Sequence, residues 1–257
     1  MLNFLINTLF KKKSKMFNVL SDKQIKELID GELGINVIRF MEIVESMGIN
    51  NTFVDLGVET GRSSKILLNN AIEKNNHVIG VDPIPAIDPT LLLNPNYTYV
   101  NADSVSTGEN YGKDKSFTPS IIFVDSIHAK EQVLCELKSW WPLLKVNGWI
   151  IFHDTAWKGY IHKANHPCAG KLTGNTAKGY DTYGGIDWET PDFAVKEFFG
   201  LNELGQYEDK FIKVEHSAKD LGMTFIQKKR ANDFSKYIAN WKIVESRRNT
   251  LLKSFGA

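Results

Sequence analysis

The sequence has few cysteines, no long apolar run and almost no net charge. Its two cysteines, Cys135 and Cys168, are too few for a disulfide framework, which favours the cytoplasm. No stretch approaches the roughly 20 apolar residues of a membrane-spanning helix. Lys and Arg total 31 against 30 Asp and Glu, a formal net charge of +1. We therefore expect a cytoplasmic protein with no transmembrane segment and no nucleic-acid partner.

The N-terminus joins an apolar stretch to basic residues in an order that does not fit a secretory signal. Residues 2–10 are largely apolar, and four lysines lie within residues 11–15. A signal peptide carries its positive charge before the apolar stretch, not after it. We expect an arm that frays or packs against the domain. A weak interfacial anchor, or a contact between subunits of a homo-oligomer, stays open.

Short apolar runs alternate with helical patterns from residue 52 onward. Five runs are predicted as strands: Thr52–Leu56, His77–Asp82, Tyr97–Val100, Ser120–Asp125 and Trp149–His153. Continuous Val, Ile and Phe residues are typical of parallel strands buried on both faces. Residues 211–214 and 223–227 predict an antiparallel pair at the sheet edge. The expected class is α/β: a Rossmann-like three-layer sandwich with a mostly parallel seven-stranded sheet and an antiparallel edge hairpin.

The helical patterns divide the chain into three parts. Residues 1–48 form an N-terminal arm and cap, in which Ser21 and Gln24 fit a capping box and residues 34–47 a second helix. Residues 49–230 form the main domain, with helices predicted over 63–74 and 129–144. Within it, residues 156–191 hold six glycines and little periodicity, which suggests a lid-like insertion. Residues 231–257 carry a terminal helix, predicted over 232–255.

Acidic residues follow four of the predicted strands: Asp55, Asp82, Asp103 and Asp125. In a doubly wound sheet, ligands bind outside the carboxyl ends of the strands. The loop after the first strand contains Gly57 and Gly61, but Glu59 replaces the second glycine of a dinucleotide fingerprint. That carboxylate would repel a pyrophosphate, whereas a sulfonium amino acid has no phosphate to repel. A nicotinamide-dependent oxidoreductase is therefore only the alternative.

Several motifs together resemble the class I S-adenosylmethionine-dependent methyltransferases. The branch most similar contains the macrocin- and mycinamicin-type sugar O-methyltransferases and the cephalosporin hydroxylase-like proteins. The motifs that carry the resemblance are Val54-Asp55-Leu56-Gly57-(x3)-Gly61-Arg62-Ser63, Gly80-Val81-Asp82, Asn101-Ala102-Asp103-Ser104, Phe123-Val124-Asp125-(x2)-His128, Leu143-Leu144-(x3)-Gly148 through His153-Asp154, and Ala194-Val195-(x2)-Phe198.

The resemblance implies a cofactor site for S-adenosylmethionine and its product S-adenosylhomocysteine. Gly57 and Gly61 would line the methionine end, Asp82 would hold the ribose, and Asp103 with Ser104 would lie near the adenine. The predicted cofactor residues are Asp55, Gly57, Glu59, Gly61, Ser63, Asp82, Asp103, Ser104 and Asp125.

A second group of residues suggests metal and acid–base chemistry. Asp125 and Asp154 follow neighbouring predicted strands, and paired carboxylates suit Mg²⁺ or Mn²⁺. His128 can reach the same space, and an imidazole titrates near neutrality. By resemblance, Asp125 and Asp154 are metal ligands and His128 is the general base. His153 stands where those relatives commonly have an acid; if it is a third ligand, Mn²⁺ or Fe²⁺ is favoured over Mg²⁺.

The predicted function is O-methylation of a sugar hydroxyl, on a nucleotide-activated or surface-glycan sugar. A sulfonium already makes its methyl group electrophilic, so the protein must align and deprotonate the acceptor oxygen. Residues 156–191 would close over the acceptor. A catalytically inactive scaffold with a methyltransferase fold is the non-enzymatic alternative.

Overall fold

The computed structural model describes residues 20–31, 33–69, 71–84, 86–156, 180–183 and 186–254. The predicted arm at residues 2–15 and most of the predicted lid lie outside the described residues. Among the described residues, no helix is long and apolar enough to cross a membrane.

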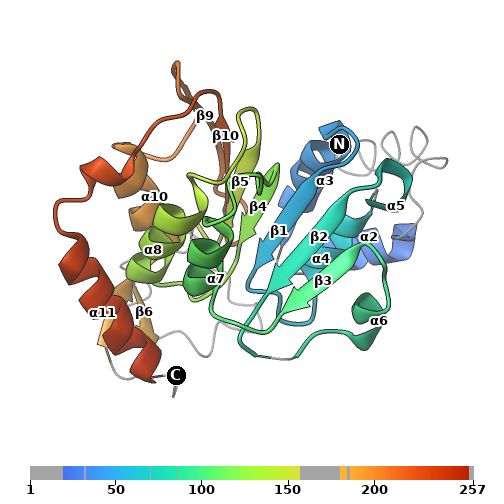
Figure 1. Ribbon diagram of the computed structural model, residues 1–257, viewed down its shortest axis with the longest axis horizontal. Coiled ribbons are helices and arrows are strands. Elements are labelled where there is room, and N and C mark those ends of the chain that lie inside the picture. Colours follow the sequence, from blue (N-terminus) through green and yellow to red (C-terminus); the bar gives the residue numbers. More distant parts are fainter. Residues whose placement is uncertain are drawn as a thin grey trace.

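One eight-stranded sheet organises the described part of the chain (Figure 1), in the order β3-β2-β1-β4-β5-β10-β9-β8. β1 to β5 run parallel, while β10 pairs antiparallel with both β5 and β9. The strands are β1 Thr52–Leu56, β2 His77–Val81, β3 Tyr97–Val100, β4 Ile121–Val124, β5 Trp149–His153, β8 Tyr207–Glu208, β9 Ile212–Ser217 and β10 Met223–Lys228.

The predicted class is confirmed, with eight strands rather than seven. The additional strand, β8, has two residues and is too short to show an alternating pattern in the sequence. A separate two-stranded hairpin, β6 Tyr180–Tyr183 and β7 Ile186–Glu189, lies within the predicted lid segment.

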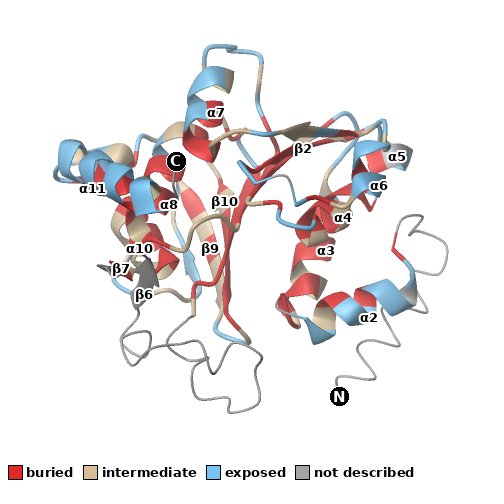
Figure 2. Cartoon of the chain, turned by 90° about the horizontal axis from the view of Figure 1, so that it is seen from below, coloured by how far each residue is buried: buried red, intermediate tan, exposed pale blue. Residues whose placement is uncertain are grey.

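Helices cover both faces of the sheet (Figure 2). One face carries α2 Asp22–Asp30, α3 Asn36–Ser46, α4 Arg62–Leu68, α5 Ala71–Lys74 and α6 Pro89–Leu92. The other carries α7 Ser104–Tyr111, α8 Lys130–Trp140, α10 Pro191–Phe199 and α11 Trp241–Ser254, with the short 3₁₀ helix η2 Ser235–Tyr237 before α11.

Alternate residues of the strands pack into two apolar cores, one on each face of the sheet. In β1, Val54 and Leu56 pack on the α8 side, while Phe53 packs on the α3 side. All four residues of β4 are buried. The continuous apolar runs of the sequence therefore do mark strands covered on both faces, as predicted.

Three predicted helices are shorter than expected. The helix over 129–144 ends at Trp140, two residues before Pro142. The helix over 63–74 is interrupted, because Asn69 ends α4 and its side chain accepts a hydrogen bond from the Leu20 backbone at 3.3 Å. Asn is a poor residue for a helix interior. The helix over 232–255 begins only at Trp241, because Asp233 accepts a hydrogen bond from Ser235 N at 2.9 Å and sets up a turn first. The capping box at Ser21 and Gln24 is present.

The carboxyl ends of β1 to β5 lie along one edge of the sheet (Figure 1). Strand order reverses between β1 and β4, which are direct neighbours with Asp55 opposite Phe123. Loops that leave neighbouring strands in opposite directions open a crevice at such a point. The predicted site residues are therefore delivered to this edge.

Close packing at Gly80 of β2 gives a test of this architecture. A Cβ at Gly80 would lie 1.9 Å from the Tyr97 hydroxyl and 2.8 Å from Val58 Cγ2. We expect Gly80→Ala to lower the free energy of unfolding by about 1–3 kcal/mol through overpacking. Gly205→Ala is the matched control: nothing lies within 4 Å of its Cβ position, and a change within about 0.5 kcal/mol is expected. Urea denaturation measures both, and equal losses would contradict the packing.

Candidate cofactor and metal site

The loop after β1 is built around the buried carboxylate of Asp55. Its Oδ2 accepts hydrogen bonds from Ser63 Oγ at 2.8 Å and from Ser64 Oγ, which ties the start of α4 to the end of β1. Its Oδ1 has no hydrogen-bond partner among the described residues. Burial raises the pKa of Asp55 to about 7, although the Ser64 and Ser63 hydroxyls lower it. Asp55 thus holds the loop in place from beneath.

Gly57 and Gly61 bring this loop against its neighbours. Both have left-handed backbones, with φ of +87° and +91°. A Cβ on Gly57 would lie 2.1 Å from the backbone oxygen of Asp125, and one on Gly61 would lie 2.2 Å from Leu91 Cδ1. Only glycine allows so close an approach at Gly57. The loop after β1 and the chain after β4 are thereby held in contact.

Asp82, at the end of β2, is bound to the same loop. Its Oδ2 accepts a hydrogen bond from Glu59 N at 2.9 Å, and its Oδ1 accepts one from Ile84 N at 2.7 Å. Glu59 itself pairs with Arg62 at 2.6 Å. The ends of β1 and β2 therefore form one hydrogen-bonded unit.

Asp103 and Ser104 lie at the start of α7, after β3. Asp103 is the N-cap of that helix, with Oδ2 accepting from Ser106 N at 2.9 Å, and its Oδ1 accepts from Arg248 of α11. Ser104 Oγ donates to Glu136 Oε1 at 2.5 Å. Both predicted residues are thus held by side chains from α8 and α11.

Four side chains gather at the ends of β4 and β5. His128 Nε2 lies 3.0 Å from Asp154 Oδ2 and 3.4 Å from Asp125 Oδ1. His153 Nδ1 lies 3.1 Å from Asp125 Oδ1 and 3.1 Å from Asp154 Oδ1. His153 and Asp154 are 5% and 2% exposed, whereas Asp125 and His128 are only partly buried. We call these four residues the Asp–His cluster.

Charges of opposite sign alternate within the Asp–His cluster. Burial lowers the pKa of His153, but Asp154 and Asp125 outweigh it and raise that pKa to about 9. The pKa of His128 is raised well above its ordinary value because Asp154 and Asp125 outweigh burial in the same way. Burial raises the pKa of Asp125, yet His153 and His128 hold it well below its usual range. Each buried charge is compensated by its neighbours.

The Asp–His cluster fits a divalent cation. The ligand atoms of Asp125, His128 and Asp154 all lie within 4.8 Å of one another. Neighbouring ligands about an octahedral ion with bonds of about 2.1 Å are separated by about 3 Å, close to the distances within the cluster. Asp154 Oδ1 is buried and accepts no hydrogen bond from any described residue, although His153 Nδ1 lies 3.1 Å away. A cation would supply a further partner for this oxygen.

A pocket of about 310 Å³ joins the glycine loop to the Asp–His cluster. It is lined by Leu33, Gly57, Val58, Glu59, Arg62, Ser63, Asp125, Ser126, His128, His153, Asp154 and Leu221. Five predicted residues do not line it: Asp55, Gly61, Asp82, Asp103 and Ser104. Asp55 lies beneath the loop, Asp82 is tied to it, and the last two lie towards α11.

Two apolar residues that line this pocket, Leu33 and Leu221, have no signal in the sequence. They come from the α2–α3 turn and the β9–β10 turn, which are joined by a hydrogen bond from Ile35 N to Asp220 Oδ2 at 3.1 Å. The two turns lie 185 residues apart along the chain, so only the fold brings them together. Arg62 and Ser126, also missed, adjoin predicted residues and could have been proposed from that proximity.

A family model described as a methyltransferase domain matches residues 54–155. These residues are a methyltransferase domain. The match begins in β1 and ends just after β5, so it includes the glycine loop, Asp82 and the whole Asp–His cluster. Together with the fold, it confirms the prediction of a class I S-adenosylmethionine-dependent methyltransferase. The oxidoreductase alternative gains no support.

Solved structures with this fold extend the likeness over most of the chain. The S-adenosylhomocysteine-bound methyltransferase of Podospora anserina is 12% identical, with a TM-score of 0.55 over 89% of this chain and 96% of that one. A Corynebacterium glutamicum protein is 10% identical, with a TM-score of 0.54 over 90% and 99%. A Bacillus cereus O-methyltransferase is 11% identical, with a TM-score of 0.51 over 88% and 97%. Such identities concern the fold alone. No curated protein matches the sequence.

The raised pKa of Asp55 predicts a pH-dependent stability. Between the ordinary value of 3.8 and about 7, the folded chain retains a proton that the unfolded chain has lost. The contribution of Asp55 to the free energy of unfolding therefore falls as the pH rises through this range, and levels off above it. Asp55→Asn removes the titration. We expect this variant to gain stability relative to the wild type, by a few kcal/mol at most, as the pH rises from about 4 to about 7.

Urea denaturation at several pH values, with the exposed Asp30→Asn variant as control, measures this difference. A difference between Asp55→Asn and the wild type that does not change with pH would contradict the buried-carboxyl account.

Proposed function

We propose that this methyltransferase transfers the methyl group of S-adenosylmethionine to a hydroxyl of a sugar, assisted by a divalent cation. One observation carries the proposal. The glycine loop and the Asp–His cluster line the same pocket, with Gly57 in contact with the Asp125 backbone. An electrophilic methyl group bound at the loop would lie beside groups able to hold and deprotonate an acceptor.

The cofactor residues keep the roles that the sequence predicts. Gly57 and Gly61 shape the loop for the methionine end, together with Glu59 and Ser63. Asp82 is assigned to the ribose hydroxyls, and Asp103 and Ser104 to the adenine side. Asp55 acts from beneath by fixing Ser63 and Ser64. Asp125 borders both the cofactor and the metal.

His128 is proposed as the general base. It lines the pocket and is partly exposed, whereas His153 is almost fully buried. The acceptor oxygen attacks the methyl carbon, the carbon–sulfur bond breaks, and S-adenosylhomocysteine leaves with the bonding electron pair. His128 has to be neutral to accept the proton of the hydroxyl, and a divalent cation bound to Asp125 and Asp154 would lower its raised pKa. Asp154, at 3.0 Å, stabilises the positive charge that His128 then gains.

Asp125, Asp154 and His153 are the proposed metal ligands, as the sequence predicts. His128 is kept as the base, although its nitrogen, rather than that of His153, completes the group of three ligand atoms within 4.8 Å of one another. A divalent cation bound there would make the acceptor hydroxyl more acidic and hold its oxygen near the methyl group. Two carboxylates alone suit Mg²⁺, but the imidazole nitrogen of His153 suits Mn²⁺ or Fe²⁺ better. The adjacent hydroxyls of a sugar are able to chelate such an ion. Four expectations from the sequence remain predictions. They are a sugar or nucleotide-sugar acceptor, a cytoplasmic location, a homo-oligomer, and domain boundaries at 48/49 and 230/231.

A test of the reaction uses His128→Ala. Incubation with S-adenosylmethionine, Mn²⁺ and a panel of sugars, nucleotide-sugars and catechols, followed by mass spectrometry, identifies the acceptor. With that acceptor, we expect kcat to fall by about 10²–10⁴-fold in the variant. Its affinity for S-adenosylhomocysteine, measured by calorimetry, should stay within about twofold, because the base does not bind the cofactor.

His77→Ala, at the distant start of β2, is the matched control and should leave both quantities unchanged. Loss of cofactor binding in His128→Ala would contradict its role. Methylation of catechols alone would contradict a sugar as the acceptor. A wild-type protein that binds no S-adenosylhomocysteine would support the alternative of a catalytically inactive scaffold.

A test of the metal uses Asp154→Asn. Calorimetric titration of EDTA-treated protein should show one Mn²⁺ site in the wild type, at least about tenfold weaker in the variant, because one buried anionic ligand is lost. Asp192→Asn, a carboxylate of α10 outside the Asp–His cluster, should bind Mn²⁺ as the wild type does. The metal proposal fails if Mn²⁺ binds equally to Asp154→Asn, or if EDTA leaves methyl transfer intact.

A further inference from the structure

A buried polar network lies behind the strand ends on the α8 side. Its centre is Glu136 of α8, which is 1% exposed. Glu136 Oε1 accepts hydrogen bonds from Ser104 Oγ at 2.5 Å, Ser126 Oγ at 2.6 Å and Gln132 Nε2 at 2.9 Å. It thereby joins the start of α7, after β3, to the loop after β4. Glu136 Oε2 is buried with no hydrogen-bond partner among the described residues.

Arg248 of α11 extends this network to the C-terminal helix. Its Nε donates to Gln132 Oε1 at 2.7 Å, and its Nη2 donates to Asp103 Oδ1. A guanidinium has only donors, so it fixes the Gln132 amide with its oxygen towards Arg248. Gln132 Nε2 is then left to donate to Ser104 Oγ at 3.0 Å and to Glu136. The direction of the Gln132 hydrogen bonds thus follows from Arg248.

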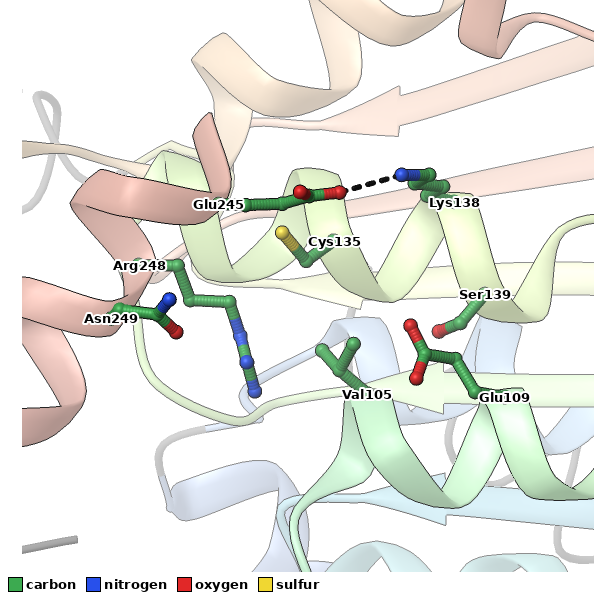
Figure 3. A pocket seen from close by; sticks show the side chains of 8 residues that line it. All are labelled: Val105, Glu109, Cys135, Lys138, Ser139, Glu245, Arg248 and Asn249. Atoms are coloured by element: carbon green, nitrogen blue, oxygen red, sulfur yellow. Dashed lines mark hydrogen bonds and ion pairs between the residues drawn. The ribbon is translucent and has the colours of Figure 1, made fainter. Parts of the chain in front are cut away.

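Arg248 makes these contacts beside an open space rather than through tight packing. A cavity of about 350 Å³ lies between α7, α8 and α11, lined in part by Val105, Cys135 and Arg248 (Figure 3). Lys138 and Glu245 pair across it at 2.7 Å, separately from the network. Shortening Arg248 would therefore enlarge an existing cavity instead of creating a new one in the core. The loss of packing should be small compared with the loss of orientation.

We propose that Arg248 is a positioning residue for the adenosine half of S-adenosylmethionine. This inference rests on the proposed function, which assigns Asp103 and Ser104 to the adenine side. Arg248 holds Asp103 directly and Ser104 through Gln132, and the network ends at Ser126, which lines the pocket. Arg248 lies 93 residues after the end of the methyltransferase match at residue 155, and the C-terminal helix is thereby part of the cofactor site.

The test compares two neighbouring arginines of α11. We expect Arg248→Ala to raise the Kd for S-adenosylhomocysteine by about tenfold or more, since two charge-assisted contacts that orient the site are lost. The KM for S-adenosylmethionine should rise by a similar factor, with kcat changed less than about threefold. Arg247→Ala is the matched control. Arg247 pairs with Glu131 at 2.7 Å and lies over the Trp188 ring, outside the network. The Kd of Arg247→Ala for S-adenosylhomocysteine should therefore stay within about twofold of the wild-type value.

Two further measurements separate positioning from general damage. Adenosine should lose affinity for Arg248→Ala by the same factor as S-adenosylhomocysteine, while Mn²⁺ should bind as in the wild type. Arg248→Lys keeps a charge for Asp103 but has no planar fork for both partners, so an intermediate Kd is expected. Thermal unfolding of each variant shows that it is folded, and if Arg248→Ala is not, Arg248→Lys carries the comparison.

Equal Kd values for wild type and Arg248→Ala would overturn the inference, as would equal losses in Arg247→Ala. A loss for S-adenosylhomocysteine but not for adenosine would also overturn it. Failure of the wild type to bind S-adenosylhomocysteine would instead remove the proposed function.

Discussion

The close approach of two backbones, at Gly57 and at Asp125, is the constraint on which the site depends. β1 and β4 are neighbouring parallel strands, and the chains that leave them touch because Gly57 has no Cβ. A side chain at Gly57 would overlap the Asp125 backbone and separate the loop after β1 from the Asp–His cluster. One glycine therefore decides whether the glycine loop and the Asp–His cluster share a pocket. The strand reversal at this point supplies the crevice, and the glycine brings its two sides together.

Buried charge is the second constraint, and the structure meets it locally. Asp55 is buried beneath the loop with two serine hydroxyls as donors, and burial raises its pKa to about 7. The Asp–His cluster instead alternates two imidazoles with two carboxylates, so that its net charge is small when both histidines are protonated. Carboxylates of one sheet edge thus serve different purposes. One supports the loop, whereas the others remain available to a ligand.

Sequence patterns predicted best what depends on neighbouring residues. Four of the five parallel strands, β1, β2, β4 and β5, are almost fully buried and mostly apolar, which is the pattern that predicts them. The edge strand β3 is only partly buried, and its aromatic and β-branched residues predict it instead. The parallel strands also predict that four residues lie close together, since neighbouring parallel strands end at one edge of the sheet. These residues are Asp125, His128, His153 and Asp154. Contacts between distant segments could not be predicted in this way. Arg248 and Asp103 lie 145 residues apart, and nothing in either segment indicates the other. β8, with two residues, has no pattern at all.

The conformation of Asp154 shows why residues outside the methyltransferase match are needed. Asp154 has a left-handed backbone, with φ of +57°, which is unfavourable for a residue other than glycine unless its surroundings hold it. Those surroundings come from the β9–β10 pair. Thr224 Oγ1 donates to Thr155 Oγ1 at 2.8 Å, and Ala156 N donates to Leu221 O at 2.9 Å. Gly222 lets the turn pack directly on Ala156, where a Cβ would lie 2.3 Å from Ala156 Cβ. The antiparallel edge therefore turns the Asp154 carboxylate into the pocket. Arg248 of α11 holds the polar network that reaches the pocket at Ser126, so the site depends on the C-terminal third of the chain at two places.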